Sequence, residues 1–120
     1  SLKVYFVRAG ELPPPSTVGE SAVYVIRRSD GWWYCGSTDS MTDRLMTHRG
    51  ERGGGSQVND PQAECCYIVM SEGGGGGGGG SMAMAVESEV IKDLDAAGFP
   101  LLSTTDAGKR HNRPKIGRGL

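Results

Sequence analysis

The sequence predicts a small mixed domain, packed as an α/β or α+β fold around an antiparallel sheet. Apolar runs rich in β-branched and aromatic residues occur at 23–28, 32–35 and 63–70, which is typical of short strands. One helix is expected after the second run, and apolar residues with helical spacing indicate another at 82–97. At 120 residues the chain has room for one domain with one core.

The first two predicted strands form a hairpin. Asp30-Gly31 separates them, and this pair of residues favours a type I′ turn, in which both central residues need a positive φ. Pairing of 23–28 with 32–35 brings two phenols, Tyr24 and Tyr34, together on a small sheet.

The N-terminal segment is expected to be an arm. Residues 2–8 alternate weakly and could add an edge strand, and Pro13-Pro14-Pro15 favours an extended linker. We therefore place a domain boundary near Ser16. The expected division is an arm and Pro-rich linker from a preceding domain at 1–15, the domain at 16–113 and a basic tail at 114–120.

The helix after the hairpin carries two candidate functional residues. Residues 37–40 supply several possible N-caps, and Gly50 can close the helix. Arg44 and His48 are four residues apart, so their side chains share one face.

The later helix follows eight consecutive glycines at 73–80, which are either a natural insertion or an engineered linker. Ser81 is expected to cap this helix and Gly98 to end it. One face is expected to be buried, and residues 99–102 could form a last strand. That face holds Met82, Val86, Val90 and Leu94, with Ala83, Ile91 and Ala97 beside them.

The formal net charge of −1 gives no general case for nucleic-acid binding, but basic residues gather near the end of the chain. Such a tail suits sequence-independent phosphate contacts, or it is a solvated terminus. Its residues are Lys109, Arg110, Arg113, Lys115 and Arg118.

Cysteines and tryptophans have simpler interpretations. Cys35, Cys65 and Cys66 indicate thiols of a reducing compartment rather than zinc ligands with His48, because no CxxC pair is present. Trp32 and Trp33 should alternate across the sheet. The outer one could stack on a base, although plain packing is the simpler interpretation.

Glu87 is the most informative acid. It follows Val86, within reach of the apolar helix face, and it is either a half-exposed charge favoured by the helix dipole or a metal ligand. Mg²⁺ takes few protein carboxylates and completes its shell with water and phosphate, so one glutamate would suffice. Tyr24 and Tyr34 with Arg44 and His48 would form a phosphate-handling surface nearby.

In their order and spacing, these motifs resemble the GIY-YIG nuclease superfamily. From Pro13 to about Arg113 the sequence looks like the C-terminal GIY-YIG domain of plant and algal organellar MutS homologues. The motifs are Ala22-Val23-Tyr24, Tyr34-Cys35-Gly36, Arg44 followed by His48, and the later helix with Ala83, Glu87 and Ile91.

The resemblance implies a three-stranded antiparallel sheet flanked by helices, and Mg²⁺- or Mn²⁺-dependent hydrolysis of DNA phosphodiesters. One of Tyr24 and Tyr34 would orient or deprotonate the attacking water, and Arg44 would neutralise charge on the scissile phosphate. His48 would hydrogen-bond a tyrosine or assist proton transfer. Glu87 would hold the single metal ion.

A partner and a compartment are also implied. The DNA would be mismatched, branched or strand-displaced, and contacted by Arg44 and by Lys109, Arg110 and Arg113 of the tail. The domain would be covalently attached to MutS-like ATPase domains in a chloroplast or mitochondrion.

One departure leaves the function open. Family members usually carry an asparagine after the later helix, where this chain has Ser103 or Thr104, and Asn112 lies farther along. A second hypothesis is therefore a DNA-binding module of the same fold that cleaves weakly or not at all. A third is a domain that docks onto its parent protein.

Overall fold

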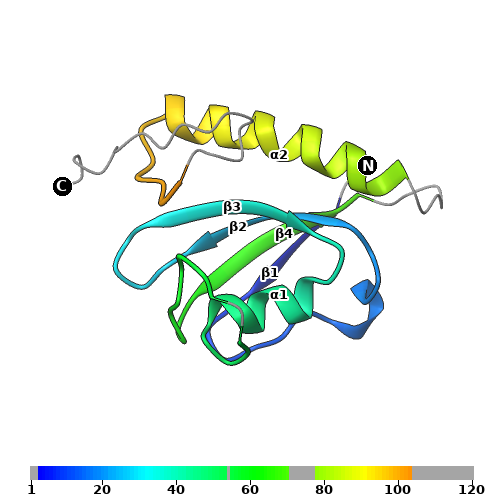
Figure 1. Ribbon diagram of the computed structural model, residues 1–120, viewed down its shortest axis with the longest axis horizontal. Coiled ribbons are helices and arrows are strands. Elements are labelled where there is room, and N and C mark those ends of the chain that lie inside the picture. The colour runs from blue at the N-terminus through cyan, green and yellow to red at the C-terminus, as the bar shows by residue number, and fades with distance from the viewer. Residues whose placement is uncertain (1–2, 54, 71–77, 104–120) are drawn as a thin grey trace.

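In the computed structural model the chain forms three layers (Figure 1). The structure describes residues 3–53, 55–70 and 78–103. A four-stranded sheet lies between helix α1 (Met41–His48) and helix α2 (Gly78–Ala96). The strands are β1 (Val4–Val7), β2 (Ala22–Arg27), β3 (Trp33–Thr38) and β4 (Glu64–Val69). They pair antiparallel in the order β1-β4-β2-β3, which confirms the predicted fold class with one strand more than the three expected.

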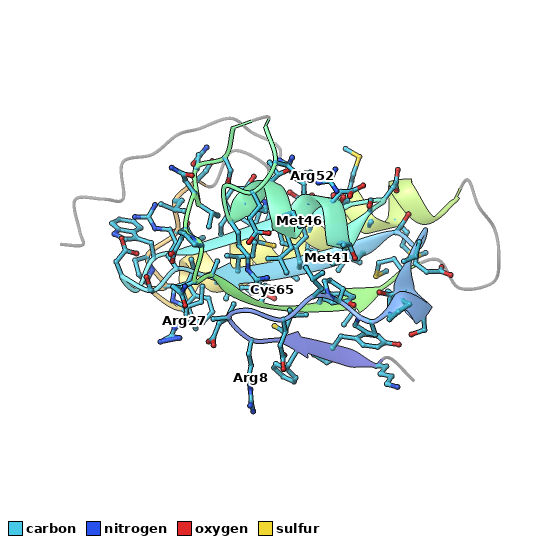
Figure 2. All side chains as sticks on the ribbon, turned by 90° about the horizontal axis from the view of Figure 1, so that it is seen from below. Arg8, Arg27, Met41, Met46, Arg52 and Cys65 are labelled. Carbon is cyan, nitrogen blue, oxygen red and sulfur yellow. The ribbon has the colours of Figure 1, made fainter. Side chains whose placement is uncertain are left out.

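Each face of the sheet has its own core because side chains alternate along the strands. On the α1 side, Tyr24 and Ile26 of β2 pack with Leu45 of α1. On the α2 side, Val23 packs with Ile91 of α2. Figure 2 views the molecule from the α1 side, and its labelled Met41 and Cys65 belong to the first of these cores.

The hairpin is present, but its turn is not type I′. Among the turn residues only Gly31 has a positive φ, of 97°, and Arg28 N–H donates to the carbonyl of Trp32 at 2.8 Å. Gly31 N–H also donates to the Arg28 carbonyl at 3.0 Å. This is the three-residue loop in which one glycine takes the left-handed conformation. Asp30 does not have the positive φ of a type I′ turn, and its carboxylate accepts hydrogen bonds from the Arg28 guanidinium.

The N-terminal segment packs against the sheet. The expected edge strand is present as β1, which pairs with β4. Pro13 is buried, and a 3-10 turn over Pro15–Thr17 follows it. The Thr17 hydroxyl contacts the Tyr67 hydroxyl at 2.9 Å, so this segment is held to the sheet rather than running free. The domain limits placed at 16 and 113 stay a prediction.

Arg49 joins this segment to the rest of the molecule. Its side chain is 3% exposed, and the guanidinium donates to the carbonyls of Arg8 at 2.9 Å, Glu11 at 2.6 Å and Ala63 at 2.9 Å. A planar fork with five N–H donors suits this arrangement. Nothing in the sequence pattern distinguished Arg49 from its neighbours.

We expect Arg49→Met to lower the free energy of unfolding by about 3 kcal/mol, because the buried carbonyl of Ala63 and the partly buried carbonyls of Arg8 and Glu11 lose their donor. Arg49→Lys should recover only part of this loss, since an ammonium group cannot reproduce the fork. Urea unfolding measures both. Arg52→Met is the control: Arg52 is half exposed and pairs with Asp43 at 3.2 Å, so its loss should cost less than about 1 kcal/mol. Equal losses of unfolding free energy in Arg49→Met and Arg52→Met would contradict the importance of the Arg49 hydrogen bonds.

Helix α2 differs from expectation at its start and in its buried face. It begins at Gly78, inside the glycine run, so Ser81 is not its N-cap. The buried positions are Ala83, Glu87 and Ile91 at four-residue spacing. Val86, Val90 and Leu94 pack against the same core, as expected, whereas Met82 is 54% exposed and Ala97 is exposed, although both were expected on the buried face. Glu87 therefore lies in the middle of the buried stripe.

The other boundaries follow the predictions closely. Ser40 is the N-cap of α1, and Gly50 and Gly98 close the two helices with φ of 81° and 90°. The expected last strand is reduced to a parallel bridge between Trp33 and Leu101. No helix within the described ranges is long and apolar enough to cross a membrane.

Candidate functional site

A pocket of about 580 Å³ opens at the outer edge of β3, between α1 and α2. Tyr34 and Gly36 face it from one side of the sheet, and Ser37, next along the strand, belongs to the other side. The pocket therefore wraps around the edge strand and collects residues from both faces. Its lining consists of Tyr24, Tyr34, Gly36, Ser37, Thr38, Arg44, Met84 and Glu87.

The strand register brings the two tyrosines together. Tyr24 pairs with Gly36 across the hairpin, and Tyr34 pairs with Ile26, so the phenols are diagonal neighbours on one face. Their ring centroids are 6.3 Å apart. Gly36 makes room for the first ring, because a Cβ there would lie 2.5 Å from the Tyr24 hydroxyl oxygen. The glycine is thus required by close approach, since it does not have a positive φ.

Helix α1 places Arg44 and His48 beside the phenols, as their spacing predicted. His48 is 1% exposed, and its Nε2 lies 2.8 Å from the Tyr24 hydroxyl. Its ring is also 5.2 Å from the ring of Tyr34. Arg44 lines the pocket together with Tyr24, and its charge favours ionisation of the phenol. His48 therefore lies behind Tyr24, while Arg44 faces the open side.

Burial sets the protonation states of this group. The pKa of Tyr24 is raised well above its usual range, first by burial and then by the neighbouring Tyr34, against the opposing effect of Arg44. The pKa of His48 is lowered to about 4 by burial and by the charge of Arg44. At neutral pH both the phenol and the imidazole are uncharged.

His48 makes stability depend on pH. Its pKa is about 4 in the folded chain and ~6.5 when unfolded, so the unfolded state binds more protons between these values. We expect the free energy of unfolding to be highest above pH 6.5 and to fall by up to about 3 kcal/mol as pH approaches 4. Urea unfolding between pH 7 and 4.5 measures this.

A His48→Gln variant is the control for this fall. Asp30 and Asp60 have pKa values below their usual 3.8, so they titrate beneath the measured window. The variant should show a nearly flat profile between pH 7 and 4.5, and an equally steep fall would assign the effect to other groups.

Glu87 reaches the pocket from the opposite face of the sheet. It is 6% exposed on the buried stripe of α2, where its neighbours one turn away are Ala83 and Ile91. Ser37 donates a hydrogen bond of 2.6 Å from its hydroxyl to the Glu87 carboxylate. A buried carboxylate on an apolar helix face costs stability unless it is hydrogen-bonded, and the Ser37 hydroxyl supplies such a bond at the edge of the pocket.

The donor set of the pocket fits one hard divalent cation. Glu87 supplies a carboxylate, and the hydroxyls of Ser37 and Thr38 lie in the same lining. Within the described ranges no three His, Cys, Asp or Glu side chains gather into a ligand cluster. A single carboxylate agrees with the manner in which Mg²⁺ is held between protein, water and phosphate.

Several of the remaining predicted residues fall outside the part of the chain that the structure describes. These are Thr104, Lys109, Arg110, Asn112 and Arg113, and the glycines at 73–77. Ser103 follows the Leu101 bridge.

Cysteines and tryptophans do not contribute to the pocket lining. Cys35 and Cys65 are buried in the cores on opposite faces of the sheet, and Cys66 is half buried. Trp33 packs edge-on against Phe99 at 5.1 Å, and Trp32 is also partly buried.

Two serines contact predicted site residues but were not singled out from the sequence. Ser37 could have been found, because strand alternation places the residue after Gly36 on the face that α2 covers. Ser56 contacts His48 Nδ1. It lies in a glycine-rich loop without periodicity, so the sequence held no signal for it.

The chain is similar to a short segment of a known repair protein. It is 38% identical over 106 residues to "DNA mismatch repair protein MSH1, mitochondrial" of Arabidopsis thaliana. The match covers 88% of this chain but only 8% of the relative. No family model and no solved structure matches the chain. A relation to one small part of a MutS-type mismatch repair protein is therefore supported, whereas the resemblance to GIY-YIG nucleases stays a prediction.

Proposed function

We propose that this chain is a Mg²⁺-dependent, structure-directed DNA endonuclease domain of a MutS-like organellar protein. One observation carries the proposal. The Glu87 carboxylate, buried on an apolar helix face, opens into the same pocket as Tyr24, Tyr34 and Arg44. A guanidinium can stabilise the charge on a transferring phosphoryl group, and a carboxylate can hold a metal ion that activates it; here both lie around one hollow with two phenols.

Each residue has a role in this reaction. Arg44 binds the scissile phosphate and offsets the charge that develops on it, for which its planar donor fork is suited. Tyr24 orients the attacking water and accepts its proton, while its own proton passes to His48 Nε2 at 2.8 Å. Tyr34 covers the imidazole and narrows the pocket.

Glu87 would hold the metal ion, with its carboxylate oriented by the hydrogen bond from the Ser37 hydroxyl. When bound, Mg²⁺ supplies polarisation of the phosphate and stabilisation of the leaving oxygen. Mn²⁺ would serve in the same position because it also prefers oxygen ligands.

The relative supports the biological setting. Its name describes a mitochondrial mismatch repair protein, so we infer that this domain acts on mismatched, branched or strand-displaced DNA. We place it in an organelle, mitochondrion or chloroplast, attached to MutS-like ATPase domains.

A cleavage assay on those three DNA types tests the activity. We expect nicking with Mg²⁺ or Mn²⁺ and none with a chelator. Arg44→Ala should lower the rate about 10³-fold and Arg44→Lys should recover part of it. Arg27→Ala is the control, because Arg27 lies outside the pocket and pairs with Glu64 at 3.6 Å. Equal rates for the parent and Arg44→Ala would overturn the proposal.

A second candidate is a DNA-binding module that does not cleave. It is favoured by the absence of an amide at the position of Ser103 or Thr104, where the GIY-YIG resemblance would place an asparagine. Salt-dependent binding of the same DNA without Mg²⁺-dependent nicking would establish it.

A further inference from the structure

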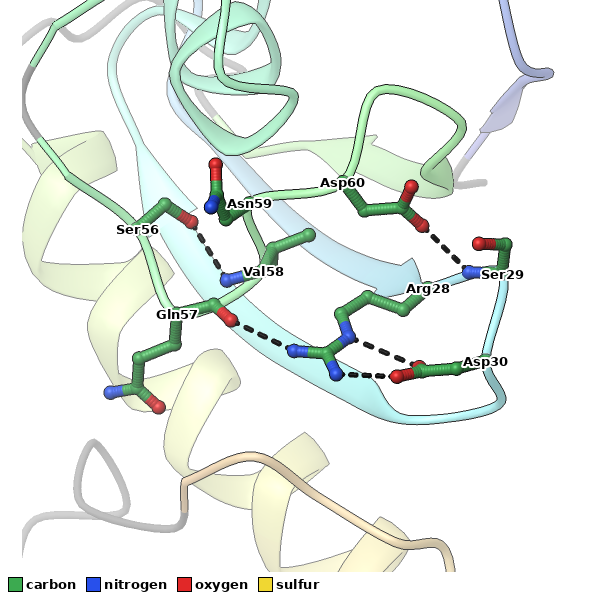
Figure 3. Close-up of a pocket in the computed structure, with 8 residues that line it drawn as sticks. All are labelled: Arg28, Ser29, Asp30, Ser56, Gln57, Val58, Asn59 and Asp60. Atoms are coloured by element: carbon green, nitrogen blue, oxygen red, sulfur yellow. Dashed lines mark hydrogen bonds and ion pairs between the residues drawn. The ribbon is translucent and has the colours of Figure 1, made fainter.

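Ser56 connects the buried imidazole to a second pocket. His48 Nδ1 meets the Ser56 hydroxyl, while His48 Nε2 meets the Tyr24 hydroxyl on the other side of the ring. The second pocket, of about 460 Å³, lies between the β2–β3 turn and residues 56–60 (Figure 3). Ser56 lines it and accepts the Val58 N–H at 2.9 Å. A continuous row of three polar groups therefore joins the two pockets.

Protonation of both ring nitrogens of His48 is unfavourable. The ring is 1% exposed, and the guanidinium of Arg44 disfavours an imidazolium beside it. A proton that arrives at Nε2 must therefore be matched by the loss of one at Nδ1. The group in contact with Nδ1 is the Ser56 hydroxyl.

Only one tautomer leaves His48 able to take the proton of Tyr24. The Tyr24 hydroxyl lies 2.8 Å from Nε2. If His48 carried its proton on Nε2, that nitrogen would have no lone pair for the phenolic proton. If the proton is on Nδ1, it is donated to the Ser56 hydroxyl, and Tyr24 donates to Nε2.

We propose that Ser56 is a positioning residue that holds His48 in the Nδ1–H tautomer and passes the reaction proton to the second pocket. This inference rests on the proposed endonuclease function. As the water oxygen bonds to phosphorus, its proton moves to Tyr24, the Tyr24 proton to Nε2, the Nδ1 proton to Ser56, and the Ser56 proton to solvent in the second pocket. The P–O bond to the leaving oxygen breaks, and that oxygen takes a proton from solvent.

The tautomer can be measured without any activity. The chain has two histidines, His48 and His111, so ¹⁵N NMR of the imidazoles is readily assigned with a His111→Gln variant. We expect Nδ1–H for His48 in the parent and in Ser56→Thr, which keeps the hydroxyl, and a mixture of tautomers in Ser56→Ala. An Nε2–H tautomer in the parent would overturn the proposal whether or not the chain cleaves DNA.

Kinetics test the transfer itself. Ser56→Ala should lower kcat about 10²-fold with an unchanged KM for DNA, and Ser56→Thr should restore most of it. Gln57→Ala is the matched control, because Gln57 lines the same pocket and contacts Arg28 through its backbone carbonyl. A Ser56→Ala variant with the kcat of the parent would overturn the proposed proton transfer through Ser56. A parent that does not nick DNA would refute the proposed function and the transfer with it, while an Nδ1–H tautomer would still support the positioning role.

Discussion

Glu87→Gln is expected to abolish cleavage while leaving the fold intact. The amide keeps the size of the side chain and can still accept the Ser37 hydroxyl, but it loses the charge that holds a hard cation. Several kcal/mol of transition-state stabilisation should disappear, which corresponds to a fall of about 10³-fold in kcat. Nicking rates at saturating Mg²⁺ provide the measurement.

Glu87→Met should also abolish cleavage, but it should raise the stability of the fold. Its side chain matches the apolar stripe formed with Ala83 and Ile91, so the free energy of unfolding should rise by about 1 kcal/mol. Glu89→Gln is the control on the same helix, since Glu89 is exposed and pairs with Lys92 at 3.7 Å. A destabilised Glu87→Met would show that the carboxylate is structural, and parental cleavage by Glu87→Gln would remove it from the reaction.

Gly36→Ala is expected to damage the site without removing any polar group. The added Cβ would lie 2.5 Å from the hydroxyl oxygen and 2.7 Å from Cζ of Tyr24, and the 1% exposed ring cannot move away freely. We expect a loss of about 2 kcal/mol in unfolding free energy. Cleavage should fall at least about 10²-fold, because the phenol is displaced from His48.

Two comparisons separate the clash from a general effect of the substitution. Gly53→Ala should be almost silent, because no atom lies within 4 Å of the added Cβ there. Combining Gly36→Ala with Tyr24→Phe removes the closer contact, so it should recover part of the stability and none of the cleavage. Parental activity in Gly36→Ala would contradict the close approach.

Local patterns predicted most of the fold. The alternating runs around Asp30-Gly31 led to the hairpin. Its register, which places Tyr24 and Tyr34 on one face, is set by the observed three-residue turn and would differ by one residue with the predicted type I′ turn. The four-residue spacing of Arg44 and His48 led to their common direction on α1. These predictions succeeded because strand and helix periodicities are properties of neighbouring residues.

The predictions that failed concerned contacts between separate segments, a polar residue on a buried face, or glycines, which have no side chain. The buried face of α2 was predicted only in part, because Glu87, a polar residue, occupies its centre, and a pattern of apolar residues drew the expected face toward the exposed Met82. The start at Gly78 could not be seen, since glycine carries no side chain that marks a helix. The contacts of Arg49 and Ser56 join segments that are separated along the chain and leave no periodic signal.

The hydrogen bonds of the Arg49 guanidinium should also determine which parts of the molecule unfold together. Its bonds tie the loop after β1 to the end of α1 and to the start of β4. An edge strand would ordinarily fray first, with amide hydrogen exchange much faster than the centre of the sheet. Here the amides of β1 that bond to β4 should exchange together with those of β2, in a single cooperative opening.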